Sequence, residues 1–164
     1  MLTKKSRLLL ALTAATPLLF AACSDNPFNP INDAAGTYQL TVYAGRSMTG
    51  GGATFLVQPG DPNFPNFPNG GTIRVTDGTF VLNTNGTFTE TNNLLETPQG
   101  QASFNDAFVS TGTWTLNGNA LSFSAPAQNQ GSARFVTGTL ELGRINYQED
   151  DGSGTVQSYE YQKL

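Results

Sequence analysis

From Gly36 onward, apolar and polar side chains alternate along the chain with a period of two. In residues 37–43, one face carries Tyr38, Leu40 and Val42, and the other face carries threonine and glutamine. Such alternation is typical of an antiparallel strand with one buried face. The same pattern recurs at residues 73–75, 80–82, 114–116, 121–123, 140–142 and 159–161.

Turn signals separate these short apolar segments. Asn85-Gly86 is typical of a tight hairpin, because a type I′ turn needs positive φ at both central residues. Residues 117–119 and 150–154 predict two further hairpins. No stretch after residue 30 has the 3.6-residue period of an amphipathic helix. The pattern therefore predicts an all-β domain built from consecutive hairpins.

A Gly-Thr-aromatic motif recurs at irregular spacing along the chain. Its aromatic residues are Tyr38, Phe80, Phe88 and Trp114, and Gly138-Thr139-Leu140 is a variant of it. We interpret the motif as a way of entering a strand: glycine allows a turn or bulge, threonine faces outward and the next side chain faces inward. The inward rings predict either an apolar ligand pocket or a packed core.

The first 23 residues have the layout of a secretion signal. A basic head, Lys4, Lys5 and Arg7, precedes an apolar run over residues 8–20. This run is too short for a bilayer core, which needs about 20 apolar residues, but it fits the apolar region of a signal peptide. Residues 19–23, Leu-Phe-Ala-Ala-Cys, resemble the site cleaved by bacterial lipoprotein signal peptidase. The resemblance implies a signal peptide over residues 1–22 and a lipid anchor in the membrane on Cys23.

Residues 24–35 are rich in proline, asparagine and aspartate, which favour turns and extended chain. We expect residues 23–35 to be the lipidated cysteine and a flexible tether, followed by one folded domain over residues 36–164. Cys23 is the only cysteine, so the domain has no disulfide. Ser24 stands where an aspartate would imply retention at the inner membrane. By resemblance to the sorting rule of two-membrane bacteria, the protein is expected at the outer membrane.

The tether and domain together resemble the lipocalin-like domains of bacterial lipoproteins. The resemblance rests on Ala-Gly-Thr-Tyr-Gln-Leu-Thr after the tether, on the hairpins over residues 80–89 and 112–123, and on the closing Tyr-Glu-Tyr-Gln-Lys of residues 159–163. It implies an antiparallel up-and-down β-barrel of about eight strands, which is either filled or holds one small ligand. A β-sandwich is the alternative fold.

Candidate chemistry is sparse. The chain has no histidine, and lipidation would occupy its one thiol, so neither a Ser-His-Asp triad nor a thiol nucleophile is expected. We predict no enzyme activity, no cofactor and no metal site. The cluster Glu149-Asp150-Asp151 lacks the spacing of a calcium loop and is interpreted as a solvated turn. The signal carries three of the eight basic residues and none of the twelve acidic ones, so the remaining chain has a net charge of −7. Nucleic-acid binding is therefore not expected.

Two features suggest contacts beyond a simple core. Glu90 has the same parity as Phe88, so in a regular strand its carboxylate points inward and needs a partner, for which Arg74 and Arg134 are candidates. The alternative is an open barrel mouth or a bulge that leaves Glu90 in water. The second feature is the loop over residues 58–71, where Phe64 and Phe67 alternate with prolines. These rings either fold over the barrel mouth, contact an envelope protein partner, or cap one end of the core.

The functional prediction is an envelope-anchored lipoprotein whose barrel binds a small apolar ligand. The residues expected to contact the ligand are Tyr38, Phe80, Phe88, Trp114 and Phe123, with Glu90 as a polar contact. The alternative is a filled barrel that acts as a structural or protein-interaction module. Side-chain sizes leave both open, because the inward positions include glycines as well as large rings.

Overall fold

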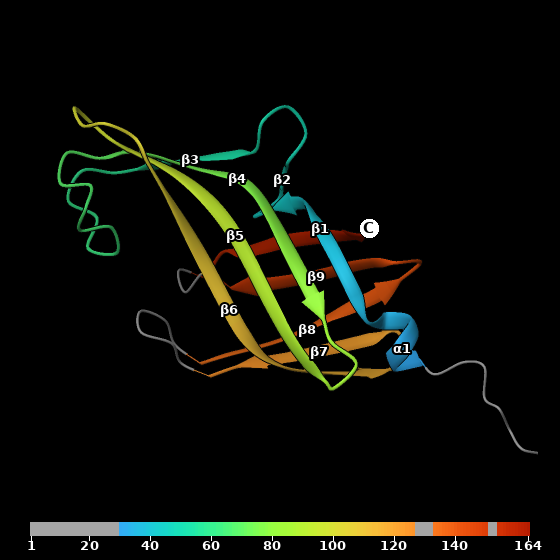
Figure 1. The fold of residues 1–164 in the computed structure, drawn as a ribbon. Coiled ribbons are helices and arrows are strands. Elements are labelled where there is room, and N and C mark those ends of the chain that lie inside the picture. The colour runs from blue at the N-terminus through green and yellow to red at the C-terminus, as the bar shows by residue number, and fades with distance from the viewer. Residues whose placement is uncertain (1–29, 127–132, 151–153) are drawn as a thin grey trace, which may run out of the picture.

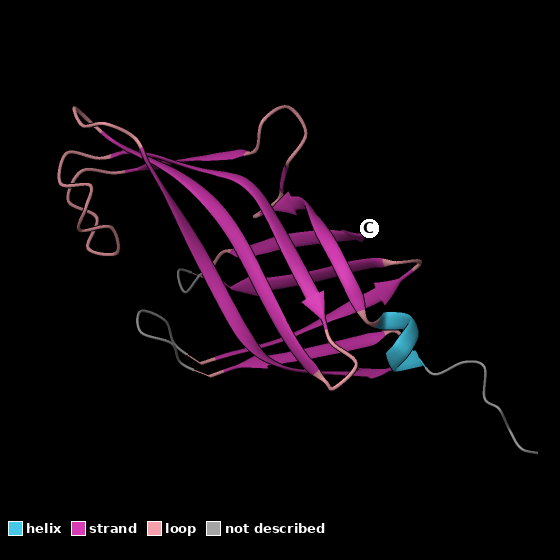
Figure 2. Cartoon of the chain, viewed as in Figure 1, coloured by secondary structure: helices cyan, strands magenta, loops and turns pink. Residues whose placement is uncertain are grey.

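The computed structural model describes residues 30–126, 133–150 and 154–164. In this part of the chain it contains one short helix and ten strands (Figures 1 and 2). They are α1 (Pro30–Ala34), β1 (Gly36–Tyr43), β2 (Arg46–Ser47), β3 (Ala53–Val57), β4 (Gly71–Leu82), β5 (Thr87–Pro98), β6 (Phe104–Asn117), β7 (Ala120–Ala125), β8 (Arg134–Glu141), β9 (Arg144–Asp150) and β10 (Val156–Lys163). The prediction of an all-β chain is confirmed.

The strands form one antiparallel sheet that closes on itself. Its order is β2-β1-β10-β9-β8-β7-β6-β5-β4-β3, and β1 also pairs with β4. Eight strands, β1 and β4–β10, therefore make a closed barrel, as predicted. The sandwich alternative is wrong, because all ten strands of the described residues belong to this one sheet. Most neighbours in the barrel are also neighbours in sequence, since tight hairpins such as Asn83–Thr87 connect them.

The barrel is closed over only part of its length. β1 pairs with β4 through Gly36–Gln39 and Thr79–Leu82. Beyond a register shift between Val75 and Asp77, β4 pairs with β3 instead. The long strands β4, β5 and β6 thus run past the closed part together with β3 (Figure 1). We call this extended side the far end, and the opposite side, where α1 lies, the α1 end.

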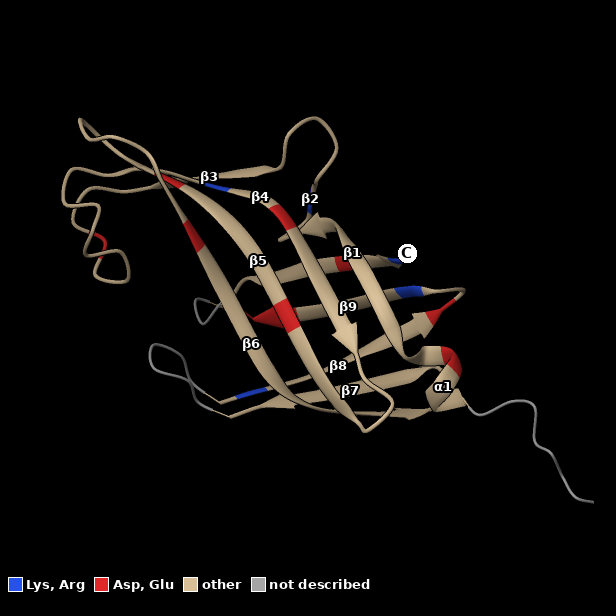
Figure 3. Cartoon of the chain, in the orientation of Figure 1, with Lys and Arg blue, Asp and Glu red and all other residues tan. Residues whose placement is uncertain are grey.

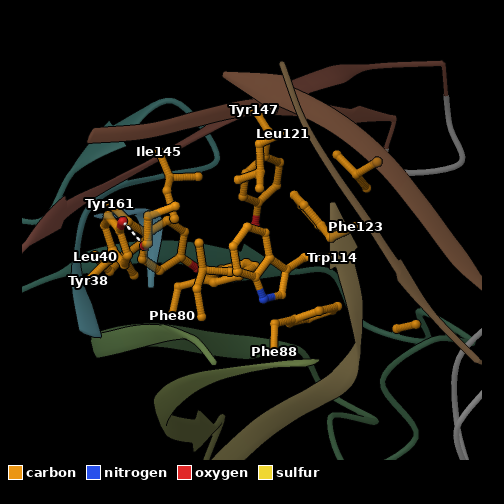
Figure 4. Close-up of a cluster of buried hydrophobic side chains, with 14 of the residues drawn as sticks. Tyr38, Leu40, Phe80, Phe88, Trp114, Leu121, Phe123, Ile145, Tyr147 and Tyr161 are labelled. Carbon is orange, nitrogen blue, oxygen red and sulfur yellow. Dashed lines mark hydrogen bonds between the residues drawn. The ribbon is translucent and has the colours of Figure 1, made fainter. Parts of the chain in front are cut away.

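Aromatic rings fill the closed part of the barrel. Phe80 stacks on Phe88 with ring centroids 5.1 Å apart, and Phe123 meets both rings edge-on at 5.3 and 5.5 Å. Figure 4 shows these side chains reaching toward one another from opposite walls. The inward glycines do not create space, because a Cβ on Gly112 would lie 2.0 Å from the carbonyl oxygen of Ser124 and one on Gly138 2.3 Å from that of Asn146. At these positions the neighbouring strand takes the room that a side chain would need.

A regular ladder of turns connects β3 to β4. The amides of Asp61, Phe64, Phe67 and Gly70 each donate to the carbonyl three residues earlier. Proline stands at the second position of each turn, at residues 59, 62, 65 and 68, where its fixed φ suits the turn. We call residues 58–70 the turn ladder. It places Phe67 (1% exposed) against Val57 and Ile73 in a small second core.

The structure departs from three sequence-based expectations. Residues 30–34, at the end of the predicted tether, form α1, whose Ala34 is buried and accepts a hydrogen bond from the hydroxyl of Tyr38. The Gly-Thr pairs 78–79, 112–113 and 138–139 lie inside strands rather than at their beginnings. Leu142, expected to continue an inward-facing strand pattern, lies in the turn between β8 and β9 and is fully exposed.

Candidate functional site

A buried carboxylate lies at the junction between the closed part of the barrel and the far end. Glu90 is the fourth of the twelve residues of β5, shares its face with Phe88, and is 1% exposed. Its Oε1 accepts hydrogen bonds from the hydroxyls of Tyr147 at 2.8 Å and Tyr161 at 2.5 Å. Its Oε2 accepts a bond from Nη1 of Arg134. The carboxylate is thus held by donors from three strands of the opposite wall.

Arg134, at the start of β8, joins Glu90 to a second carboxylate. Its Nε and Nη2 donate to the two oxygens of Glu149 at 2.7 and 2.6 Å, a bidentate pair. Its Nη2 also donates to the hydroxyl of Tyr147 at 3.0 Å. The guanidinium lies 5.4 Å from the ring centroids of Phe123 and Tyr147. One arginine therefore lies between two carboxylates. We call Glu90, Arg134, Tyr147, Glu149 and Tyr161 the polar group.

The three charged side chains of this group are exposed to increasing degrees, from Glu90 through Arg134 to Glu149. The side chain of Glu90 is 1% exposed, that of Arg134 14% and that of Glu149 28%. Tyr159 stacks on Tyr147 with centroids 4.8 Å apart, and Tyr43 meets Tyr159 edge-on at 5.2 Å. These rings continue the inner surface from the buried carboxylate toward the far end.

Burial and neighbouring charges shift the pKa values of the tyrosines and of the arginine in this group. Burial raises the pKa of Tyr147 and of Tyr161 well above the ordinary value, and the charge of Glu90 raises both further. Burial alone would lower the pKa of Arg134, but the charge of Glu90 and the hydrogen bonds of Glu149 outweigh it, so the pKa is raised. The tyrosines are therefore neutral donors and Arg134 is a permanent cation at any physiological pH.

Beyond Glu90, the inner face of β6 changes from buried to exposed, whereas the inner face of β5 stays buried or half-buried. Asn92 is 2% exposed and donates to Glu90, and it fits there because Gly78 opposite has no Cβ, which would lie 2.3 Å from the Asn92 side-chain oxygen. Phe108 is paired with Asn92, so the two share a face. Phe108 is nevertheless 50% exposed, and Phe104, paired with Glu96, is 40% exposed.

We compared the chain with models of known families, with curated proteins and with solved structures. None of these comparisons finds a match.

The residues predicted to contact a ligand come together, but they contact one another. Phe80, Phe88 and Phe123 form a continuous ring cluster. Tyr38 lies under α1, and Trp114 donates from its indole nitrogen to the carbonyl of Asn83 at 3.0 Å. All five are 4% exposed or less. They form the packed interior of the closed part, and only Glu90 belongs to the polar group.

Sequence reasoning leaves Glu90 open between an inward ion pair and a solvated side chain, and names Arg74 and Arg134 as candidate partners. Glu90 points inward and Arg134 is its partner, so the alternative of a solvated Glu90 is wrong; Arg74 is exposed on the other face of β4. The sequence predicts a solvated turn at Glu149, but this residue lies in β9 and pairs with Arg134. Tyr147 was missed, although the alternation of Ile145, Tyr147 and Glu149 is a signal that β9 has an inner face.

Several sequence-based predictions fall on other parts of the chain. Cys23, the signal peptide and residues 24–29 lie outside the described residues, as does Asp151. Within the described residues, no helix is long and apolar enough to cross a membrane. The same residues contain no group of three or more histidine, cysteine or acidic side chains placed to hold a metal ion. The lysine and arginine positions of the described residues are spread over both ends of the barrel in Figure 3, and Arg144 and Lys163 lie on the neighbouring strands β9 and β10.

Proposed function

We propose that this protein is a lipid-anchored component of the cell envelope whose barrel holds a small, largely apolar molecule at its far end. The observation that supports a ligand most strongly is Phe108, which shares the inner face of the wall with buried Asn92 and is half exposed. Apolar side chains on an inner face that the core leaves uncovered are what an apolar ligand needs. The packed rings of the closed part would form the floor of such a site.

The polar group suggests how a ligand would be oriented. Arg134 and Glu149 are its most exposed members, and their bonds to each other leave carboxylate and hydroxyl oxygens able to accept further hydrogen bonds. A ligand with an apolar body and one hydrogen-bond donor, such as an alcohol or amine, matches this arrangement. We propose binding rather than catalysis, because arginine and tyrosine already hold both carboxylates in place.

The proposed anchor rests on the sequence of residues 19–23 and on the single cysteine. Its test is the mass of the mature protein extracted from membranes of a bacterial host. We expect a chain beginning at Cys23 and carrying lipid, and we expect Cys23→Ser to be found in the soluble fraction. An unmodified Cys23 in the mature protein would contradict the anchor.

The proposed ligand site is tested with N-phenyl-1-naphthylamine, an apolar dye whose fluorescence rises in apolar surroundings. We expect the protein to bind the dye, and Phe108→Ala to weaken binding by on the order of tenfold, as the loss of one apolar side-chain contact implies. The matched control is Phe135→Ala, since Phe135 is 75% exposed on the outer face of β8. Dye binding that is absent, or equally weakened by both changes, would contradict the site.

A filled barrel that contacts another envelope protein is the second candidate, and one observation favours it. The turn ladder buries Phe67 but leaves Phe64 37% exposed beside it, with ring centroids 6.1 Å apart. Of these two rings, Phe64 is the one accessible to a partner. A photo-crosslinking residue at position 64 that captures a defined envelope protein, when position 135 captures none and no dye binds, would support this candidate instead.

A further inference from the structure

The α1 end carries a leucine in a conformation that disfavours leucine. Leu142 and Gly143 form the turn between β8 and β9, with φ of 51° and 73°. Positive φ at both central positions is the type I′ geometry, for which asparagine followed by glycine is preferred. A bulky residue in this region is unusual, because its Cβ crowds the following carbonyl. Leu142 is also fully exposed, so it gains no core packing in return.

Hydrogen bonds fix this turn beside other parts of the α1 end. The amide of Lys163 donates to the carbonyl of Gly143 at 2.7 Å, which places Leu164, 81% exposed, next to the turn. The amide of Leu140 donates to the carbonyl of Asn119 at 2.9 Å. Two exposed leucines thus lie on hydrogen-bonded backbone at this end, and we call Leu142 and Leu164 the leucine pair.

The same end is where the chain enters the described structure. Pro30 and Asp33 of α1 and Leu142 line one groove of about 620 Å³. Only six residues separate Cys23 from Pro30, and the seven Cα-to-Cα steps between them reach at most about 25 Å when fully extended. The twelve residues of β5, at about 3.3 Å each, span about 40 Å. A lipid on Cys23 therefore keeps the α1 end near the bilayer and permits the far end to lie away from it.

We propose that the leucine pair is a membrane-docking surface that inserts into the bilayer to which the lipidated protein is anchored. The inference rests on the proposed lipid on Cys23. Charge does not supply the attraction, because each basic residue at this end has an acidic neighbour: Arg144 is the strand partner of Glu141, and Lys163 donates to the backbone carbonyl of Asp33. Apolar side chains at the interface supply it, and they hold the barrel upright with its far end open to the surrounding compartment.

Tryptophan fluorescence of the full-length, lipidated protein tests the surface. Leu142→Trp and the control Leu56→Trp each add one indole; Leu56 is 77% exposed on β3 at the far end. The native Trp114 is 4% exposed and gives the same background in both. The proteins are reconstituted in vesicles of phosphatidylethanolamine and phosphatidylglycerol at 3:1, with or without brominated acyl chains, which quench only indoles in contact with them.

We expect brominated lipid to quench the added indole of Leu142→Trp and to leave that of Leu56→Trp unchanged. Equal quenching of both by aqueous iodide, with none by brominated lipid, would overturn the membrane surface while the anchor stands. A blue shift in the emission of the indole at position 142, without quenching by brominated lipid, would also overturn the membrane surface. It would assign the leucine pair to a contact with a protein or with residues 24–29 instead. The mass of the same preparation reports the lipid separately, and an unlipidated Cys23 would remove the anchor and this surface together.

Discussion

Single residues at the centre of the barrel act through their partners. Glu90 is tolerated in an apolar interior because Arg134, Tyr147 and Tyr161 satisfy its oxygens. The removal of one partner leaves a buried charge without compensation, which is more costly than the absence of the whole group. The polar group is thus a point at which the fold is sensitive to small changes.

We expect Arg134→Met to lower the free energy of unfolding by about 3 kcal/mol, because Glu90 loses its buried counter-charge. Urea unfolding at neutral pH measures the change. The matched control is Arg74→Met, which removes an exposed arginine from β4 and should cost less than about 0.5 kcal/mol. If the two variants are equally stable, the ion pair does not stabilise the barrel.

A substitution in the turn at Leu142 is expected to have the opposite effect and to raise stability. Leu142→Asn should raise the free energy of unfolding by about 1 kcal/mol, since asparagine adopts the left-handed conformation more readily. For a domain of this size the midpoint of thermal unfolding should rise by roughly 3 °C. Leu142→Ala is the control, because alanine removes the exposed side chain but keeps the unfavourable conformation. An equal rise in both variants would show that the backbone conformation is not the cause.

These two residues also show what local sequence can and cannot predict. The inward direction of Glu90 follows from alternation with Phe88, so it was predictable. Its contact with Arg134 spans 44 residues and depends on how β5 and β8 face each other across a closed barrel. Leu142 continues the alternation begun by Leu140, and Leu-Gly is not a usual hairpin turn, so local pattern placed it in a strand.

At the scale of elements, the turn ladder packs on a hydrophobic cluster much smaller than the barrel core. Phe67, Val57 and Ile73 form a cluster separate from the barrel core, joined to it through Leu94. β3 pairs only with β4, so it forms one edge of the sheet. The loop was recognised from its length and prolines. The three-residue spacing of those prolines, read as repeated turns, would have predicted the ladder as well.

We expect Phe67→Ala to release the turn ladder and β3 without unfolding the barrel. Hydrogen exchange should show faster exchange of the amides of residues 53–57, while those of β7 to β10 keep their protection. Phe64→Ala is the matched control, because it removes the same ring from the same ladder at an exposed position. Loss of protection throughout the barrel in Phe67→Ala would show that the second core is not an independent unit.

At the scale of the whole molecule, all five tyrosines point into or border the barrel interior. Burial is the first cause of a raised pKa at each one, and it raises that of Tyr38 to about 12. In the unfolded chain tyrosines ionise near pH 10. The unfolded state therefore loses protons first, so stability is fully present below pH 10 and falls as the pH rises above it.

We expect no tyrosine to titrate near pH 10 while the barrel is folded. Absorbance at 295 nm, which reports tyrosinate, should rise only together with the loss of the β-sheet circular dichroism signal. Both should occur in one transition above pH 10. A rise near pH 10 with the circular dichroism intact would contradict the burial of the tyrosines.

The molecule as a whole has two unlike ends. The α1 end carries the leucine pair and the entry of the chain, and the far end carries Phe104 and Phe108 on an inner face. The closed antiparallel architecture was predictable from alternation, hairpins and resemblance. The division of the interior into a packed part and an extended part was not, because it depends on where β4 exchanges β1 for β3 as its partner.

The central claim, a ligand at the far end, is tested most directly by native mass spectrometry of the full-length protein extracted from bacterial membranes in mild detergent. We predict an adduct of a few hundred daltons beyond the mass of the lipidated chain, lost on denaturation and reduced in Phe108→Ala but not in Phe135→Ala. A mass equal to that of the lipidated chain alone, unchanged after incubation with N-phenyl-1-naphthylamine, would contradict the claim and leave a filled barrel that acts through its surface.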